Sequence, residues 1–99
     1  MLTQAHVYIK GDVIGAGFRS WIRIQAKMIG VNGWVRDNFE RPEIFGKSGG
    51  IEAVFQGDEK KVEEIVEAVK QGPAIAHVVD VEVIWQDPKD IFETLEIRK

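Results

Sequence analysis

The sequence predicts an α+β sandwich in which two helices cover one face of an antiparallel sheet. Hydrophobic and polar residues alternate along four segments, which is the pattern of half-buried strands. Two other segments repeat hydrophobic residues every three to four positions, as amphipathic helices do. The segments follow one another as strand, helix, strand, strand, helix, strand. For a chain of 99 residues without internal repeats, we expect a single domain over residues 1–99.

The expected strands are short and are bounded by glycine, proline or charged residues. They cover residues 4–10, 31–36, 51–56 and 79–85, with a further short strand near 92–97. A loop is expected over residues 37–50, because this segment contains Pro42 and three glycines. That loop is longer than a tight hairpin requires.

The two expected helices have recognisable ends. The first begins near Phe18 and ends at Gly30, since glycine accepts the left-handed conformation that closes many helices. The second follows Asp58, whose carboxylate can accept hydrogen bonds from the first turn, and ends at Gly72-Pro73. Its expected buried stripe consists of Val62, Ile65, Val66 and Val69. This order of elements is the ferredoxin-like βαββαβ arrangement.

Composition excludes several classes of function. There is no cysteine, so disulfides, thiolate catalysis and cysteine-bound metal sites are ruled out. His6 and His77 lie far apart in the sequence, and we expect no metal site and no cofactor. The net charge of −3 argues against a general nucleic-acid binder. Without a signal peptide or a membrane-spanning apolar run, we expect a cytoplasmic monomer with no membrane partner.

A glycine-rich loop between the first strand and the first helix is the main candidate for a binding site. Gly11, Gly15 and Gly17 favour a tight turn that leaves backbone N–H groups free. These groups, together with the positive end of a helix dipole, favour an oxyanion. Arg19 adds a guanidinium that suits phosphate geometry. The spacing matches neither common nucleotide-binding glycine motif, so a tight turn beside a surface arginine remains an alternative.

Two linked motifs resemble those of the acylphosphatase family. The first is G-x-V-x-G-x-G-F-R over residues 11–19, and the second is G-V-x-G-W-V-R over residues 30–36. The resemblance continues through E-A-V-F-Q-G at residues 52–57 and through Gly72-Pro73 into the strand that follows. It implies a hydrolase that cleaves the carboxyl–phosphate bond of a small-molecule acyl phosphate without a metal or cofactor.

The resemblance also implies which residues form the site. The family's catalytic arginine corresponds to Arg19. Its phosphate cradle corresponds to the backbone of Ile14, Gly15, Ala16, Gly17, Phe18 and Arg19. We expect inorganic phosphate or sulfate to bind in the same cradle. Ile14 and Ala16 replace the family's usual glutamine and valine, which should matter little where main-chain N–H groups do the binding.

The family's second catalytic residue is an asparagine directly after G-W-V-R/K, and that position is Asp37 here, followed by Asn38. In one interpretation Asn38 reaches the site and orients the attacking water. This requires a bulge or an early strand end at Asp37, because a shift of one residue reverses the direction of the side chain. In the other, Asp37 occupies the site and activity is weak, since a carboxylate repels a phosphoryl dianion and donates no hydrogen bond. The chemistry of an amide favours Asn38.

Two other functions are compatible with parts of the sequence. A non-catalytic phosphate- or anion-binding domain would keep the cradle and lack the amide that positions water. A nucleic-acid module would stack bases on Trp34 and Tyr8, but the acidic charge balance argues against it. The sequence therefore predicts a metal-independent acylphosphatase.

Overall fold

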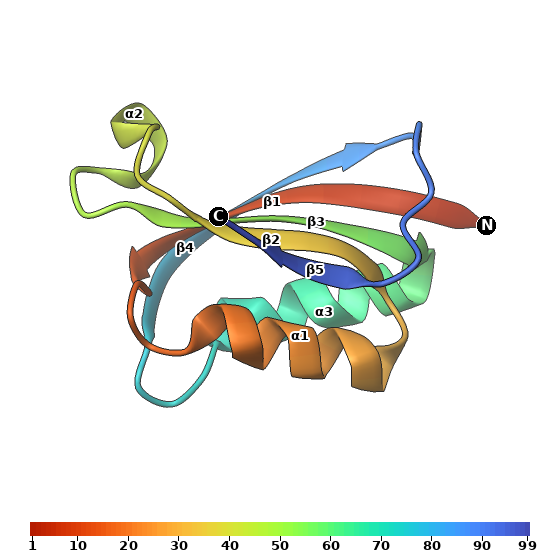
Figure 1. Cartoon of the computed structure of the whole chain (residues 1–99), viewed down its shortest axis with the longest axis horizontal. Helices are drawn as coiled ribbons and strands as arrows, with labels where there is room; N and C mark the ends of the chain where they lie inside the picture. Colours follow the sequence, from red (N-terminus) through yellow and green to blue (C-terminus); the bar gives the residue numbers. More distant parts are fainter.

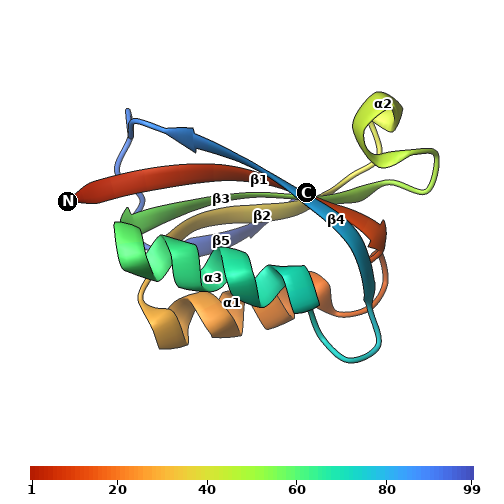
Figure 2. The same cartoon turned by 180° about the vertical axis from the view of Figure 1, so that it is seen from behind.

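A computed structural model describes residues 1–99, which form five strands and three helices. The elements are β1 (Leu2–Asp12), α1 (Phe18–Ile29), β2 (Asn32–Asn38), α2 (Pro42–Phe45), β3 (Gly50–Asp58), α3 (Glu59–Gln71), β4 (His77–Gln86) and β5 (Leu95–Arg98). Helices α1 and α3 lie side by side on one face of the sheet, as the views from both sides show (Figures 1 and 2). The predicted α+β sandwich is confirmed.

The sheet has the order β4-β1-β3-β2-β5 and is mixed. The first four strands pair antiparallel, as predicted, whereas β5 pairs parallel with β2 at the edge of the sheet. The expectation of a wholly antiparallel sheet is therefore corrected for β5. The chain between β4 and β5 is held by Gln56, which donates to Asp90 O at 2.7 Å and accepts from Phe92 N–H at 3.0 Å. These bonds guide the chain to the opposite edge of the sheet, where β5 begins.

The hydrophobic core fills the space between the two long helices and the sheet. Helix α1 contributes Phe18, Ile22 and Ala26, and α3 contributes the predicted stripe of Val62, Ile65, Val66 and Val69. Strands β1 and β3 supply the opposite layer from Ala5, Val7, Ile9, Ile51, Ala53 and Phe55. Each large side chain buried in this way contributes about 1.5–3 kcal/mol. The core thus fixes the end of β1 relative to the start of α1.

Two local expectations need correction. Asp58 occupies the N-cap position of α3, but its side chain makes no capping hydrogen bond and lies 3.6 Å from the α-amino group of Met1. The loop expected over residues 37–50 starts later, because β2 continues to Asn38, and it contains the short helix α2. None of the helices combines the length and the apolar character needed to cross a membrane.

Candidate active site

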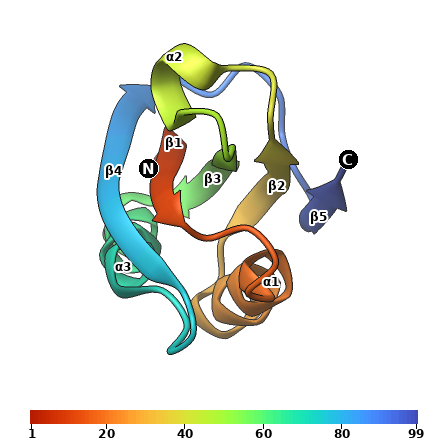
Figure 3. The same ribbon diagram turned by 90° about the vertical axis from the view of Figure 1, so that its left-hand side faces the viewer.

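The loop between β1 and α1 is anchored in the core at both ends. Val13 and Phe18 are buried on either side of the turn. Phe18 packs edge-to-face against Trp21, with ring centroids 5.5 Å apart. It also lies so close to Gly72 that a Cβ at that position would come within 2.9 Å of the ring. The loop is therefore held at the end of the molecule where β1 ends, α1 begins and β2 ends (Figure 3).

The loop backbone offers free hydrogen-bond donors. Gly15 and Gly17 have φ angles of 79° and 69°, which an L side chain rarely adopts. The N–H groups of residues 14–17 donate to no acceptor in the chain, and the next loop bond runs from Trp21 N–H to Gly17 O at 3.0 Å. Helix α1 has no side-chain cap and no acidic residue in its first turn. An anion bound here would meet both the free N–H groups and the positive end of the helix.

The side chains of Arg19 and Asp37 meet beside this loop. The Nε atom of Arg19, in the first turn of α1, lies 3.3 Å from Oδ1 of Asp37 near the end of β2. The Arg19 side chain is 41% exposed and that of Asp37 is 20% exposed. Asp37 shares the helix-facing side of β2 with the buried Val35, because side chains two residues apart point the same way. Strand β2 thus places a carboxylate next to the guanidinium.

Asn38 lies on the opposite face of the sheet. The pairing of β2 with β3 runs without a shift through Asp37–Ile51 and Asn38–Gly50, so the bulge that Asn38 needs to reach Arg19 is absent. The side chain of Asn38 is buried, its Nδ2 donates to Oε1 of Glu52 at 2.9 Å, and its Oδ1 accepts from Glu40 N–H at 2.8 Å. The structure therefore brings Asp37, and not Asn38, to Arg19.

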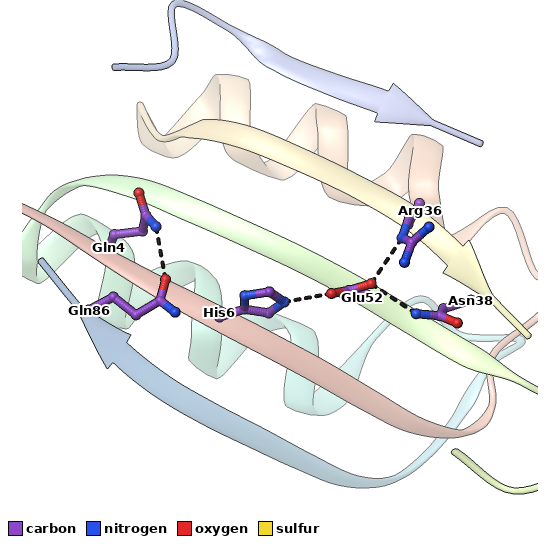
Figure 4. Close-up of polar contacts among 6 residues, drawn as sticks. All are labelled: Gln4, His6, Arg36, Asn38, Glu52 and Gln86. Carbon is purple, nitrogen blue, oxygen red and sulfur yellow. Dashed lines mark hydrogen bonds and ion pairs between the residues drawn. The ribbon is translucent and has the colours of Figure 1, made fainter. Parts of the chain in front are cut away.

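Glu52 on β3 is the centre of a polar cluster on this second face. It is 7% exposed and accepts hydrogen bonds from Arg36 Nε and Asn38 Nδ2 at Oε1, each 2.9 Å long. The Nε2 N–H of His6 donates to its Oε2 at 2.6 Å, and Figure 4 shows the three partners converging from β1 and β2. Burial by itself raises the pKa of Glu52, but the bonds from His6, Asn38 and Arg36 outweigh it and leave that pKa below its ordinary value.

Replacing Glu52 with glutamine should destabilise the fold at neutral pH by roughly 1–3 kcal/mol, because buried partners lose a charged acceptor. The pKa of Glu52 is lower in the folded chain, so its stabilising contribution is present above the unfolded pKa and disappears as the pH falls through the folded pKa. The difference in the free energy of unfolding between wild type and Glu52→Gln should therefore shrink in acid. Urea unfolding of both proteins at neutral pH and at about pH 3 measures this difference.

The matched control for this variant is Glu82→Gln on β4, which removes an exposed carboxylate from the same sheet. It should change stability by less than about 0.5 kcal/mol. A loss in Glu52→Gln that stays equal at both pH values would contradict the assigned role of the carboxylate.

A cleft of about 320 Å³ runs from Arg19 and Asp37 past the end of the sheet. One wall is the turn of residues 38–40, which the two hydrogen bonds of Asn38 hold in place. Arg36 and Arg98 line the same cleft from the ends of β2 and β5. The opening is large enough for a small phosphorylated molecule.

Comparison with known proteins shows the family of this chain. The sequence model of the Acylphosphatase family matches residues 5–97. The chain belongs to the acylphosphatase family. A curated acylphosphatase of Pelotomaculum thermopropionicum is 40% identical over 94 residues, which are 95% of this chain and 94% of the relative. One of Haloarcula marismortui is 40% identical over 96 residues, covering 97% of this chain and 96% of the relative. The crystal structure of acylphosphatase from Bacillus subtilis is similar with a TM-score of 0.86 at 27% identity. The match covers 100% of this chain and 100% of that chain.

In this acylphosphatase the glycine loop, Arg19 and Asp37 lie together at one end of the fold. The Glu52 cluster and the position of Arg98 beside Arg36 were not predicted from the sequence. Glu52 carries a weak signal, being a charged residue in a strand where nearly all other residues are buried. Arg98 carries none, since its place depends on the parallel pairing of β5 with β2.

Proposed function

We propose that this chain hydrolyses acyl phosphates to a carboxylate and inorganic phosphate, with Arg19 and the backbone of residues 14–19 holding the phosphoryl group. The observation that carries the proposal is the set of N–H groups without acceptors in residues 14–17, next to the half-exposed guanidinium of Arg19. Inorganic phosphate and sulfate should occupy the same cradle, because they present the same oxygens to the same donors.

Hydrolysis of an acyl phosphate requires few catalytic groups from the protein. The leaving group is a carboxylate whose conjugate acid has a pKa of about 4 to 5, by analogy with aspartate and glutamate, so it departs without a general acid. The remaining tasks are to hold the phosphoryl oxygens, to offset their charge and to align a water with the breaking bond. The loop N–H groups and the Nη groups of Arg19 perform the first two tasks in this proposal.

We assign the third task to Asp37. Its support is the helix-facing position beside Arg19, at the motif position of the family's asparagine. A carboxylate oxygen can accept a hydrogen bond from the attacking water and so orient it, although it cannot donate to the phosphoryl group. Asn38 then acts as a positioning residue, since its amide holds the turn of residues 38–40 that forms one wall of the cleft. Because all these residues lie in one chain, we also propose that a monomer suffices.

Hydrolysis of benzoyl phosphate tests the proposal. We expect turnover, with inorganic phosphate as a competitive inhibitor because it occupies the same cradle. Size-exclusion chromatography of the active protein should give the mass of one chain. Competitive binding of phosphate without any turnover would instead support the alternative of a non-catalytic anion-binding domain.

A further inference from the structure

Two arginines that the proposed reaction does not use lie next to each other at the mouth of the cleft. The parallel register of β2 and β5 pairs Arg36 with Arg98, which puts both on the sheet face opposite the helices. Both residues line the same cleft as Arg19 and Asp37. Two guanidinium groups therefore stand at one end of a cleft whose other end holds the phosphoryl site.

Arg36 is held in place while much of its guanidinium stays available. Glu52 accepts from the Nε of Arg36 at 2.9 Å, and Glu52 is in turn fixed by His6 and Asn38 (Figure 4). The Nη groups of Arg36 make no hydrogen bond within the chain, and its side chain is 31% exposed. A guanidinium held in this way can bind a carboxylate with little loss of side-chain entropy.

The side chain of Arg98 is also restrained and is partly exposed. Its guanidinium carbon lies 5.1 Å from the ring centroid of Trp34, a cation–π contact that restrains the side chain. Its one charged partner, Glu96, lies 3.3 Å from Nη2, and both side chains are about half exposed. An exposed ion pair of this kind is weak and yields readily to another carboxylate.

Positive side chains gather at this end of the cleft. The whole chain has a net charge of −3, yet Arg36, Arg98 and Lys99 lie together beside the cleft. The phosphoryl group already has Arg19 and the loop N–H groups. Asp37 and Glu40 are the acidic residues that line the cleft.

We propose that Arg36 and Arg98 form a second anion subsite, which binds a carboxylate on the acyl part of the substrate. This proposal rests on the proposed function, in which the phosphoryl end of the substrate occupies the cradle beside Arg19. The preferred substrates are then acyl phosphates whose acyl group carries a distal carboxylate, rather than acyl phosphates with a neutral acyl group.

A matched pair of substrates tests the subsite: benzoyl phosphate and the same compound with a carboxylate in the para position. The readout is the ratio of kcat/KM for the carboxylated compound to kcat/KM for benzoyl phosphate. In Arg98→Gln this ratio should fall about three- to tenfold, as expected for the loss of a partly exposed ionic contact. Arg98→Lys keeps the positive charge, so its ratio should lie between those of Arg98→Gln and the wild type.

Two controls separate a bound carboxylate from a general effect of charge. Lys60→Gln removes one positive charge from the exposed surface of α3, which does not line the cleft. It should leave the ratio of kcat/KM values at its wild-type value. Added salt should lower the wild-type ratio, because partly exposed charges are screened. A ratio that Arg98→Gln does not reduce would overturn the subsite, even where salt lowers the wild-type ratio.

The design distinguishes failure of the subsite from failure of the proposed function. Turnover of benzoyl phosphate with an Arg98-independent ratio rejects the subsite and leaves the function intact. If neither compound is hydrolysed, the proposed function fails, and calorimetry with benzylphosphonate and its para-carboxy analogue then tests the subsite by binding. Equal affinities for the two phosphonates would reject it, whereas a preference for the carboxylated one that Arg98→Gln removes would support it.

Discussion

Arg19→Ala should abolish turnover and phosphate binding together. Arg19 supplies a positive side chain directly after the free N–H groups of the glycine loop, and in the proposed reaction it faces the charge of the transferred phosphoryl group. Loss of an arginine that stabilises such a group costs about 10³-fold or more in rate. The measurements are kcat/KM for benzoyl phosphate and the inhibition constant of inorganic phosphate, and both should deteriorate because one guanidinium serves both.

The matched control is Arg23→Ala, one turn further along α1 on the exposed surface. It removes the same charge from the same helix, away from Asp37, and should retain kinetics within about threefold of wild type. Near-normal kinetics in Arg19→Ala would remove the site assignment. If Arg19→Ala loses turnover but still binds phosphate normally, Arg19 stabilises the transition state and does not contribute to phosphate binding.

The loop and Arg19 could be predicted from sequence because their geometry is local. Glycines at positions that need positive φ, followed directly by a helix start, bring N–H groups and arginine together within nine residues. The buried Val13 and Phe18 on either side are equally visible as apolar residues flanking the turn. The free N–H groups and the guanidinium thus come from one short segment, although the packing of Phe18 against Gly72 fixes its place in the fold.

The choice between Asp37 and Asn38 could not be made from sequence. Neighbouring residues in a strand point to opposite faces, so the answer depends on where β2 ends and whether it bulges. The pairing partners Ile51 and Gly50 decide this by extending the ladder to Asn38. Nothing in the residues around Asp37 shows that extension, and the hydrogen-bonding capacity of an amide favours Asn38, which lies on the far face of the sheet.

The Glu52 cluster arises from contacts that are still more distant. Glu52 alternates like an ordinary outward-facing strand residue, yet the face that carries it is partly covered. Helix α2 lies away from α1 and α3 (Figure 1), and its Phe45 packs against Tyr8 with ring centroids 5.8 Å apart. Tyr8 in turn stacks on His6 at 4.9 Å. The long loop after β2 thus helps to bury a carboxylate that the strand pattern alone would leave in solvent.

Asp37→Asn should raise kcat/KM for benzoyl phosphate at neutral pH. An amide can accept from the attacking water through its oxygen while its NH₂ group donates to a phosphoryl oxygen, which a carboxylate cannot do. The change also removes a repulsion of roughly 4 kcal/mol for unit charges about 4 Å apart at an effective dielectric of about 20. Arg19 offsets part of that repulsion through its 3.3 Å contact with Asp37. A net gain of about tenfold follows.

The same substitution should tighten phosphate inhibition, because Arg19 no longer divides its charge between a side chain and the ligand. Asp80→Asn on β4 is the matched control, since it removes an exposed carboxylate that lies 3.8 Å from Lys10 at a distance from the cleft. It should leave both constants close to wild type. A rate that falls in Asp37→Asn would show that the carboxylate itself is needed, for example to draw a proton from the water.

Asn38→Ala separates the two interpretations of this pair. In the structure its amide holds Glu52 and the backbone of Glu40, so its loss should lower stability by about 1–3 kcal/mol and slow turnover only through a displaced cleft wall. A residue that positions the water would behave in the opposite way, losing turnover with stability and phosphate affinity unchanged. If Asp37→Asn leaves the rate unaltered while Asn38→Ala abolishes it, the assignment to Asp37 is wrong. The variant that combines Asp37→Asn with Asn38→Ala gives a further test. If it keeps the gain in kcat/KM seen in Asp37→Asn alone, residue 37 positions the water, because the two side chains then act independently on opposite faces of β2.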